Sequence, residues 1–232
     1  MIQTIGHRGA AALEPENTLR GFRKAIEIGV DYVEFDIHRC KSWELVVIHD
    51  ETVDRTTNGK GFVRDLTLQE LKKLDAGKGE RIPTLQEAID ACKGKIKMNI
   101  ELKDKGLEKD VINILVGSGI KESEFFIISF IHEAVKNAKE EAAKQKIKIK
   151  TGVLISGNPL NVDEMAKAAN ADFVSASHFF VDERMVRQAR KAGLGFTVWT
   201  VNTEHDMKRM VKLGVDMIAS DSPDLLMKVL GR

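Results

Sequence analysis

Two acidic residues with strand spacing, Glu34 and Asp36, are the first candidates for chemistry in this 232-residue sequence. In a β-strand, residues i and i+2 point to the same face, so both carboxylates would point together while Phe35 points away. Two acids on the inner face of a strand repel each other and lose their hydration, and a bound cation is the simplest compensation. Taken alone, this spacing is also typical of a strand with one exposed face.

The same spacing recurs at Glu101 and Lys103, near the end of the strand expected next along the chain. Asn99, Glu101 and Lys103 would share one face, which adds a third carboxylate and a fixed cation beside the first two acids. Three oxygen ligands suit a hard divalent ion, Mg2+ or Ca2+ with Mn2+ as a further candidate, better than zinc or copper. Without the first pair of acids, Glu101 and Lys103 would be interpreted as a surface ion pair.

Two histidines at the ends of candidate strands could transfer protons. His7 lies in Gly6-His7-Arg8-Gly9, directly after the first β-rich run, and His49 follows another run at 45–48. Two histidines in this setting, one beside an arginine, suggest general acid and general base catalysis on a phosphate group. The remaining histidines are interpreted as structural or surface residues, and the first of them is the least secure because it shares the face of Asp36: His38, His132, His178 and His205.

Short β-rich runs that alternate with longer amphipathic stretches must position these side chains. This alternation indicates βα units and a parallel sheet. About eight units in this length fit an α/β fold of the TIM-type (β/α)8 barrel class, and a doubly wound open sheet is the competing arrangement. The expected strands are Ile2–Gly6, Tyr32–His38, Ile96–Lys103, Phe125–Ser129, Ile149–Ile155, Asp172–Ser175, Gly195–Thr200 and Asp216–Ala219.

Helices are expected between these strands. Asn17 is a candidate cap for the first helix, and Gly29 and Gly214 stand where helices can end in the left-handed conformation. Pro83-Thr84 precedes an apolar run, as is common at a helix start. The expected helices are Thr18–Gly29, Leu85–Cys92, Leu107–Ser118, Glu133–Gln145, Val162–Ala169, Glu183–Ala192 and Glu204–Leu213.

About forty residues, 39–81, are not explained by this simple alternation. They include a second β-like run at Leu45–His49 and a short helical piece near Leu68–Leu74. Because the segment is too short for an independent domain, residues 1–232 are expected to form a single domain with an insertion at about 50–80. In a barrel, such an elaborated βα loop would lie above the strand ends, where active sites are built.

Charge and hydropathy exclude several classes of partner. The chain has 36 Lys and Arg against 35 Asp and Glu, a formal net charge of +1, so no basic excess favours nucleic acid.

The two cysteines of the chain, Cys40 and Cys92, form neither a disulfide framework nor a paired-cysteine metal motif. We expect a cytoplasmic protein, because the sequence shows neither a signal-peptide core nor a stretch long enough to span a bilayer. The sequence does not indicate an oligomeric state.

In their order along the chain, these motifs resemble those of the glycerophosphodiester phosphodiesterase family. The main matches are His7-Arg8-Gly9, Glu16-Asn17, Glu34-Phe35-Asp36, Val46-Val47-Ile48-His49-Asp50 and Glu101-Leu102-Lys103. Further matches are Asp54-Arg55-Thr56-Thr57-Asn58-Gly59, Ile82-Pro83-Thr84-Leu85, Ser129-Phe130, Trp199-Thr200-Val201-Asn202 and Asp221-Ser222-Pro223-Asp224. The sequence departs from the family's T-x-D-G turn, where it has Cys40-Lys41-Ser42-Trp43, so a different turn geometry is expected there.

The resemblance implies a TIM-type barrel with a small insertion after the second strand. It also implies metal-dependent hydrolysis of a small-molecule glycerophosphodiester to an alcohol and glycerol 3-phosphate. In the family, a neighbouring glycerol hydroxyl is thought to attack and give a cyclic phosphate that water then opens. The residues assigned in this way are Glu34, Asp36 and Glu101 for one divalent metal ion, His7 and His49 for acid and base catalysis, and Arg8, Lys103 and Trp199 for substrate or phosphate binding.

Two other classes of function remain open at this point. The first is a different barrel enzyme, such as a lysophospholipase D or a metal-dependent sugar isomerase. The intact pair of His7 and His49 favours phosphodiester cleavage over isomerisation. The second is a non-catalytic phosphoglycerol-binding relative, which should have lost a ligand or a histidine, whereas this sequence retains them all. The sequence indicates neither the headgroup preference nor which histidine is the acid.

Overall fold

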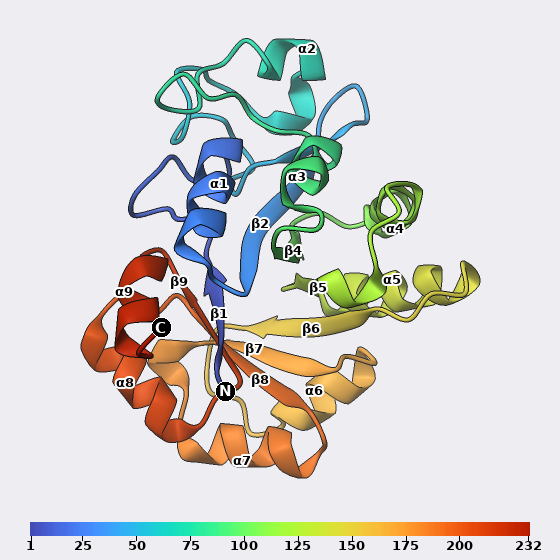
Figure 1. Ribbon diagram of the computed structural model, residues 1–232. Coiled ribbons are helices and arrows are strands. Elements are labelled where there is room, and N and C mark those ends of the chain that lie inside the picture. The colour runs from blue at the N-terminus through green and yellow to red at the C-terminus, as the bar shows by residue number, and fades with distance from the viewer.

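A closed barrel of eight parallel strands forms the centre of the computed structural model, which describes residues 1–232 (Figure 1). Neighbouring strands are hydrogen-bonded in the order β1-β9-β8-β7-β6-β5-β4-β2, and β1 also pairs with β2, which closes the barrel. The predicted TIM-type barrel is confirmed, and the open doubly wound sheet is wrong. The barrel strands are β1 (Gln3–Gly6), β2 (Tyr32–Arg39), β4 (Lys97–Leu102), β5 (Phe125–Ser129), β6 (Lys150–Ile155), β7 (Phe173–Ser177), β8 (Gly195–Trp199) and β9 (Met217–Ser220).

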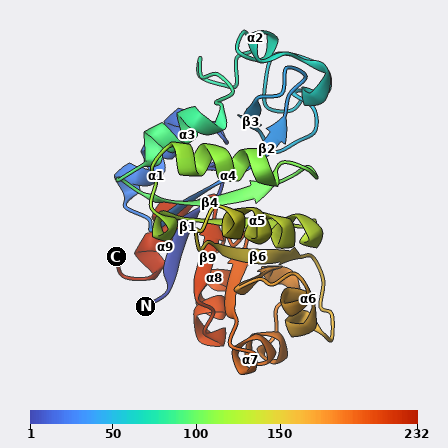
Figure 2. The same ribbon diagram turned by 90° about the vertical axis from the view of Figure 1, so that its right-hand side faces the viewer.

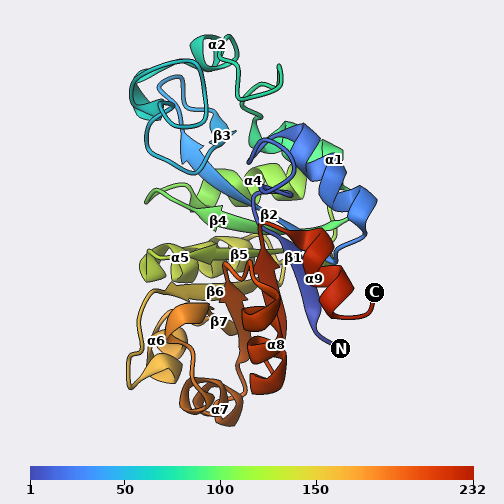
Figure 3. The same ribbon diagram turned by 90° about the vertical axis from the view of Figure 1, so that its left-hand side faces the viewer.

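Helices surround the barrel, as the views from its two sides show (Figures 2 and 3). Thr18 caps the first helix by accepting the Gly21 N–H, so the expectation that Asn17 is the cap is wrong. Gly29 and Gly214 end α1 and α8 in the left-handed conformation, as expected. No helix is both long and apolar enough to cross a membrane. The surrounding helices are α1 (Leu19–Ile28), α3 (Leu85–Cys92), α4 (Glu108–Gly117), α5 (His132–Lys144), α6 (Val162–Ala168), α7 (Glu183–Lys191), α8 (Glu204–Leu213) and α9 (Pro223–Val229), the last of which was not expected.

In strand β2, side chains that pack against the surrounding helices alternate with side chains that point into the barrel. Its outward side chains Val33, Phe35 and Ile37 are apolar and pack under the helices, with the ring of Phe35 centred 5.3 Å from that of Phe22 in α1. Burial of this apolar face stabilises the strand, which allows the opposite face to carry polar groups inside the barrel. The polar inward residues are Glu34, Asp36 and His38, and all three are buried.

Three aromatic rings fill the N-terminal end of the barrel. The ring of Phe126 lies 5.0 Å from that of Tyr32 and 4.9 Å from that of Phe173, in the latter case edge to face. Gly152 makes room for this layer, because a Cβ there would lie 2.2 Å from the Phe173 ring. Side chains therefore close this end of the barrel, and the C-terminal end is left for a polar site.

Three aspartates at the same end are held by the chain itself. Each precedes a barrel strand, and its carboxylate accepts a backbone N–H from the previous strand at 2.7–2.8 Å. Two of them also form ion pairs, with Arg232 at 2.7 Å and with Lys139 at 2.9 Å. These basal aspartates thus have the partners that a partly buried carboxylate requires. The backbone pairs are Asp31 with Thr4, Asp172 with Thr151, and Asp216 with Phe196.

The insertion after β2 lies at the edge of the molecule, beyond α1 and α3 (Figure 1). It begins with β3 (Leu45–Val47), which pairs antiparallel with β2, and includes a 3-10 turn at Val63–Asp65 and the short helix α2 (Leu68–Leu71). The β2–β3 turn forms without the Asp-Gly pair, because Trp43 adopts the positive φ of 78°. The insertion has its own small core, made of Cys40, Val46, Ile48, Val53, Val63, Leu71, Ala76 and Ile82.

Candidate active site

Three carboxylates meet inside the barrel, toward the C-terminal ends of β2 and β4. Glu34 and Asp36 come from β2 and Glu101 from β4, and the strand register places Asp36 beside Glu101. One oxygen from each acid lies within 4.8 Å of the others. The exposed fractions of the three side chains are only 3%, 1% and 10%. The face shared along each strand therefore brings the acids together as the spacing predicted.

Asp36 has more positive partners than the other two acids. Its Oδ1 lies 3.1 Å from Lys103 Nζ, and its Oδ2 accepts a hydrogen bond from Asn17 Nδ2 at 2.8 Å. Arg8 Nε lies 3.6 Å from the same Oδ2. Burial works against ionisation, but the charges of Lys103, His49 and Arg8 outweigh it and hold the pKa of this carboxyl at about 2. Asp36 is therefore negatively charged at neutral pH.

Glu34 accepts the backbone N–H of Arg8 at 2.8 Å, and Glu101 accepts a hydrogen bond from Lys103 Nζ at 2.7 Å. These single partners do not offset burial and the charge of Asp36. Burial, followed by the nearby charge of Asp36, raises the pKa of Glu34 to about 7 and that of Glu101 to about 8. The buried Asn99 Oδ1, which shares their cavity, has no hydrogen-bond partner. The cluster thus holds more oxygen donors than the chain itself satisfies. A hard divalent cation, which prefers oxygen ligands, fits this donor set.

His7 is anchored by a carboxylate from the far end of the chain. Its Nδ1 lies 2.6 Å from Asp221 Oδ1, and Asp221 accepts a hydrogen bond from Asn202 Nδ2 at 2.6 Å. Desolvation lowers the pKa of His7, but the charge of Glu34 and the bond to Asp221 outweigh it, so the net shift is upward. Nε2 of His7 lies 3.9 Å from Glu34 Oε2. A ring held at Nδ1 in this way presents Nε2 for proton transfer.

His49 has an equivalent anchor. Its Nδ1 lies 2.7 Å from Asp50 Oδ1, and Asp50 receives a hydrogen bond from Arg55 Nε at 2.7 Å. Arg55 also binds both oxygens of Glu16 at 2.7 Å, and Glu16 accepts a bond from Arg8 Nη1 at 2.9 Å. Burial is the largest cause of a lowered pKa at His49. A chain of ion pairs through the insertion therefore links His49 to Arg8.

His38 lies next to His49 without entering the cavity. Its Nδ1 is 2.9 Å from Asp104 Oδ1, and its Nε2 is 3.1 Å from the carbonyl oxygen of His49. The imidazole thus ties the end of β2 to the loop that carries His49. This position agrees with the interpretation of His38 as a structural residue.

The central cavity has a charged side and an apolar side. Trp199 forms part of the apolar side, where its Nε1 donates to the Ser175 carbonyl at 3.2 Å and its ring meets Phe130 edge to face at 5.5 Å. Asp36 is buried beside the cavity, and every other predicted site residue lines it. A molecule that joins an anionic group to a carbon skeleton matches this division. The charged side consists of His7, Arg8, Glu34, His49, Glu101 and Lys103, and the apolar side includes Ile128, Phe130, Leu154 and Trp199.

The match to a family model now decides which family this arrangement represents. Residues 7–225 match the glycerophosphoryl diester phosphodiesterase family. The chain belongs to this family. The matched range contains all three carboxylates and both histidines, so the resemblance seen in the motifs is confirmed. The predicted enzyme class, a phosphoric diester hydrolase, is confirmed with it.

Similar members of the glycerophosphoryl diester phosphodiesterase family extend over nearly the whole chain. The glycerophosphodiester phosphodiesterase of Caldanaerobacter subterraneus subsp. tengcongensis is 39% identical, over 97% of this chain and 96% of the relative. That of Bacillus subtilis is 31% identical, over 98% and 86%. A phosphodiesterase of Oleispira antarctica, solved with its product sn-glycerol-3-phosphate, is 28% identical and has a TM-score of 0.88, over 99% of this chain and 97% of its own.

The sequence did not indicate which side chains hold the candidate site residues in place. Asp50 and Asp221 were noted only as parts of motifs, although each lies beside a histidine Nδ1 in the fold. Asn17 was assigned to a helix end, whereas its side chain donates to Asp36. The residue type of Asn17 could have indicated an unusual backbone position, because its φ of 56° is a conformation that asparagine adopts more readily than most residues. The partnership of Asp221 with His7 spans the whole chain, and no local pattern indicates it.

Proposed function

We propose that this chain hydrolyses glycerophosphodiesters to an alcohol and glycerol 3-phosphate. The three acids Glu34, Asp36 and Glu101 would hold one divalent ion, Mg2+ or Ca2+, while His7 and His49 transfer protons. The observation that carries the proposal is the buried, undercompensated acid cluster that shares one cavity with two carboxylate-anchored histidines. The proposal treats residues 1–232 as one catalytic domain.

The charged side of the cavity suits a phosphodiester. Such a group carries one negative charge, and more charge gathers on its non-bridging oxygens as the phosphorus is attacked. Arg8 and Lys103 are held in place by carboxylates, so neither needs to reorganise when that charge develops. The divalent ion, when bound, would supply further positive charge for the same oxygens.

Proton transfer is the role proposed for the two histidines. Cleavage requires one group to take a proton from the attacking oxygen and another to give one to the departing alkoxide. Asp221 holds His7 and Asp50 holds His49, so both rings keep a fixed orientation through the reaction. Because the two roles need opposite protonation states, the rate should follow a bell-shaped pH profile.

The apolar side of the cavity would receive the glycerol carbons. Trp199 and Phe130 offer ring surface there, which would leave the glycerol hydroxyls turned toward the charged side. We propose that the 2-hydroxyl of glycerol attacks the phosphorus. An analogue without that hydroxyl should then bind but turn over far more slowly, because intramolecular attack can contribute several kcal/mol through proximity.

One assay tests the central proposal. Glycerophosphocholine is incubated with the protein and Mg2+ or Ca2+, with and without EDTA, and glycerol 3-phosphate and any cyclic phosphate are followed by 31P NMR. We expect product formation that EDTA abolishes and added metal restores. Binding of the substrate without product under any divalent ion would favour a non-catalytic phosphoglycerol-binding protein. Equal turnover of the 2-deoxy analogue, without a cyclic species, would remove the neighbouring-hydroxyl step alone.

A further inference from the structure

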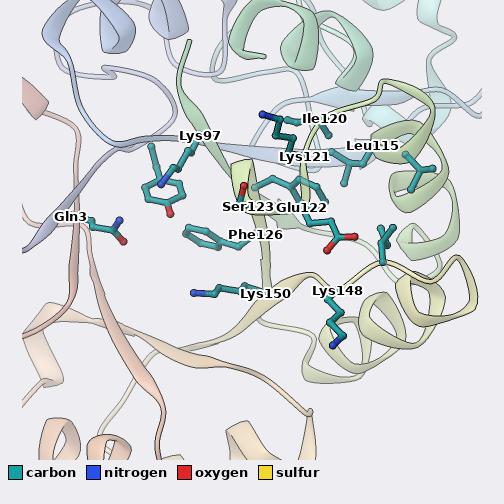
Figure 4. Close-up of a pocket in the computed structure, with 14 residues that line it drawn as sticks. Gln3, Lys97, Leu115, Ile120, Lys121, Glu122, Ser123, Phe126, Lys148 and Lys150 are labelled. Carbon is teal, nitrogen blue, oxygen red and sulfur yellow. The ribbon is translucent and has the colours of Figure 1, made fainter. Parts of the chain in front are cut away.

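A second cavity, of about 840 Å³, lies at the end of the barrel opposite the candidate active site (Figure 4). We call it the basal cleft. The aromatic layer of Tyr32 and Phe126 forms its floor and separates it from the acidic cluster. A molecule bound in the basal cleft would therefore be distinct from the substrate. The residues that define the cleft are Tyr32, Lys97, Phe126 and Lys150 at the strand ends, and Leu115 and Val116 near the end of α4.

The basal cleft concentrates positive charge in a chain that is almost neutral. Its lining contains Lys97, Lys121, Lys148 and Lys150 and one acid, Glu122, an excess of three positive charges against a net charge of +1 for the whole chain. None of the four lysines has a carboxylate within 4.0 Å, so their charges are available to a ligand. Charge of one sign along a cleft with low-dielectric walls favours an anion.

The two sides of the basal cleft differ in chemistry. Figure 4 shows Gln3, Lys97 and Lys150 on one side of the cleft, and Leu115 on the other side, where Glu122 and Lys148 also lie. The Lys97 ammonium lies 5.3 Å from the ring centre of Tyr32, so the first side also has an amphipathic ring at its base. The side of Leu115 is open to solvent, because Val116 there is 40% exposed. The apolar wall of the cleft includes Leu115, Val116, Ile120 and Ile147.

We propose that the basal cleft binds a single-chain amphiphile with an anionic head group. The head would lie between Lys97 and Lys150, and the alkyl chain would cover Val116 and its apolar neighbours. The volume is within the range of small-molecule sites, which combine apolar walls with a few polar groups. A flat anionic membrane would use the lysines but would leave the apolar recess beneath them unfilled, so a discrete amphiphile fits the cleft better.

The sole tyrosine of the chain allows a direct test, because it lies in this cleft. Protein labelled with 3-fluorotyrosine gives one 19F signal, from Tyr32, and 5-fluorotryptophan labelling gives two, from Trp43 and from Trp199 in the other cavity, which Trp43→Phe distinguishes. We expect monomeric decanoate to shift the Tyr32 signal saturably and to leave the Trp199 signal unchanged. Octanoate should bind up to about fifteenfold more weakly, because it is two methylenes shorter and each buried methylene contributes up to about fourfold. Decanol should bind more weakly than decanoate.

Variants test the contributions of the lysine charges and of the apolar wall to binding separately. Lys97→Gln with Lys150→Gln should weaken decanoate binding at least about tenfold, and Val116→Asp should weaken it by repelling the head group and the chain. Lys212→Gln on the exposed face of α8 is the matched control and should change nothing. Decyl phosphate, compared with decanoate, distinguishes a phosphate from a carboxylate head. The proposal is overturned by an unsaturable Tyr32 signal, by equal affinity for octanoate and decanoate, or by lysine-dependent binding to phosphatidylglycerol vesicles without any response to decanoate.

Discussion

The carboxylates at the two ends of the barrel differ in what the chain provides for them. At the N-terminal end, Asp31 and Asp172 each accept a backbone N–H and pair with a basic side chain. At the C-terminal end, Glu34 and Glu101 are more deeply buried, lie beside a third acid and have raised pKa values. The basal aspartates are compensated within the fold, whereas the single partners of Glu34 (the Arg8 N–H) and Glu101 (Lys103) do not offset their burial and mutual repulsion.

This contrast teaches how to separate structural from functional acids of the same type. A carboxylate that meets its hydrogen-bonding needs inside the fold contributes to stability. One whose partners do not offset its burial and the charge of neighbouring acids costs stability, and it is retained where a ligand supplies the missing charge. The predictions below test this division, because substitutions at the two ends should affect different measurements.

The largest effect is expected at the upper acids. Glu34→Gln should reduce turnover more than about a hundredfold, because it removes one of three charged ligands proposed for the metal. It should also weaken metal binding, and high Mg2+ or Ca2+ should restore part of the activity. In EDTA its melting temperature should be unchanged or higher than that of the wild type, since one repelling charge is gone. Unaltered turnover and metal affinity by calorimetry would refute the proposed role of this residue.

Substitution of either histidine should reduce turnover by a similar factor, but the metal affinity and the response to the leaving group should differ from those of the acid variants. His7→Ala and His49→Ala should each reduce turnover by at least about a hundredfold, the usual contribution of a general acid or base. Metal affinity should change little. A nitrophenyl diester, whose leaving group needs no proton, should rescue the variant that lacks the acid but not the one that lacks the base. Equal losses with both substrates in both variants would contradict separate roles.

Arg55 is an intermediate case, because it forms ion pairs with two carboxylates near the candidate active site. It holds Asp50 beside His49 and Glu16 beside Arg8. Arg55→Gln should reduce turnover by about tenfold to a hundredfold through misplaced partners, with little change in metal affinity. Arg55→Lys should recover only part of the loss, because an ammonium group cannot reproduce the forked contacts. Unchanged kcat in both variants would show that the network is dispensable.

The basal aspartates should affect stability rather than turnover. Asp172→Ala leaves the Thr151 N–H without its acceptor and Lys139 without its partner. A buried donor left unpaired costs about 1–3 kcal/mol, which corresponds to a melting temperature lower by roughly 2–10 °C for a chain of this size. The kcat at 25 °C should stay that of the wild type. Calorimetry and the glycerophosphocholine assay on the same sample provide the two readings.

The smallest effect is a dependence on pH at Asp31. Burial works against its ionisation, but hydrogen bonds from Arg232 and Thr4 outweigh it and lower its pKa. A carboxyl with a lowered pKa stabilises the fold above the ordinary aspartate value of about 4 and loses that contribution as the pH falls below it. Asp31→Asn should therefore melt lower than the wild type at pH 7, and the difference should shrink below pH 4. A constant difference from pH 7 to pH 3 would contradict this origin.

Much of the fold and the convergence of the three acids could be predicted from local periodicity, whereas the other predicted residues of the cavity lining were assigned through the resemblance to the family. The i, i+2 spacing of Glu34 and Asp36 placed them on one face, and parallel neighbours then brought Glu101 to them. What was missed depends on contacts between distant segments. The partners of His7 and Asp36 are such contacts, and the hydrogen bond from Asn17 to Asp36 crosses from a loop to a strand.

The turn between β2 and β3 shows a limit of predictions from local turn residues. Loss of the Asp-Gly pair predicted a different turn geometry, and the hairpin forms with Trp43 in the left-handed conformation. Pairing of the two strands and the small core of the insertion fix the hairpin whatever the turn residues prefer. Local turn chemistry was outweighed there by tertiary packing.

The bond between His7 and Asp221 has a consequence for the biosynthesis of the protein. The two residues are 214 positions apart, so the ribosome makes His7 long before it makes Asp221. At about 5–20 residues per second, translation leaves His7 without its anchor for roughly ten to fifty seconds. β1 likewise waits for β9 before its edge is paired. Chains that stall or are cut before Asp221 would thus lack the anchor of His7, and full turnover would begin only once Asp221 has been made and β9 has paired with β1.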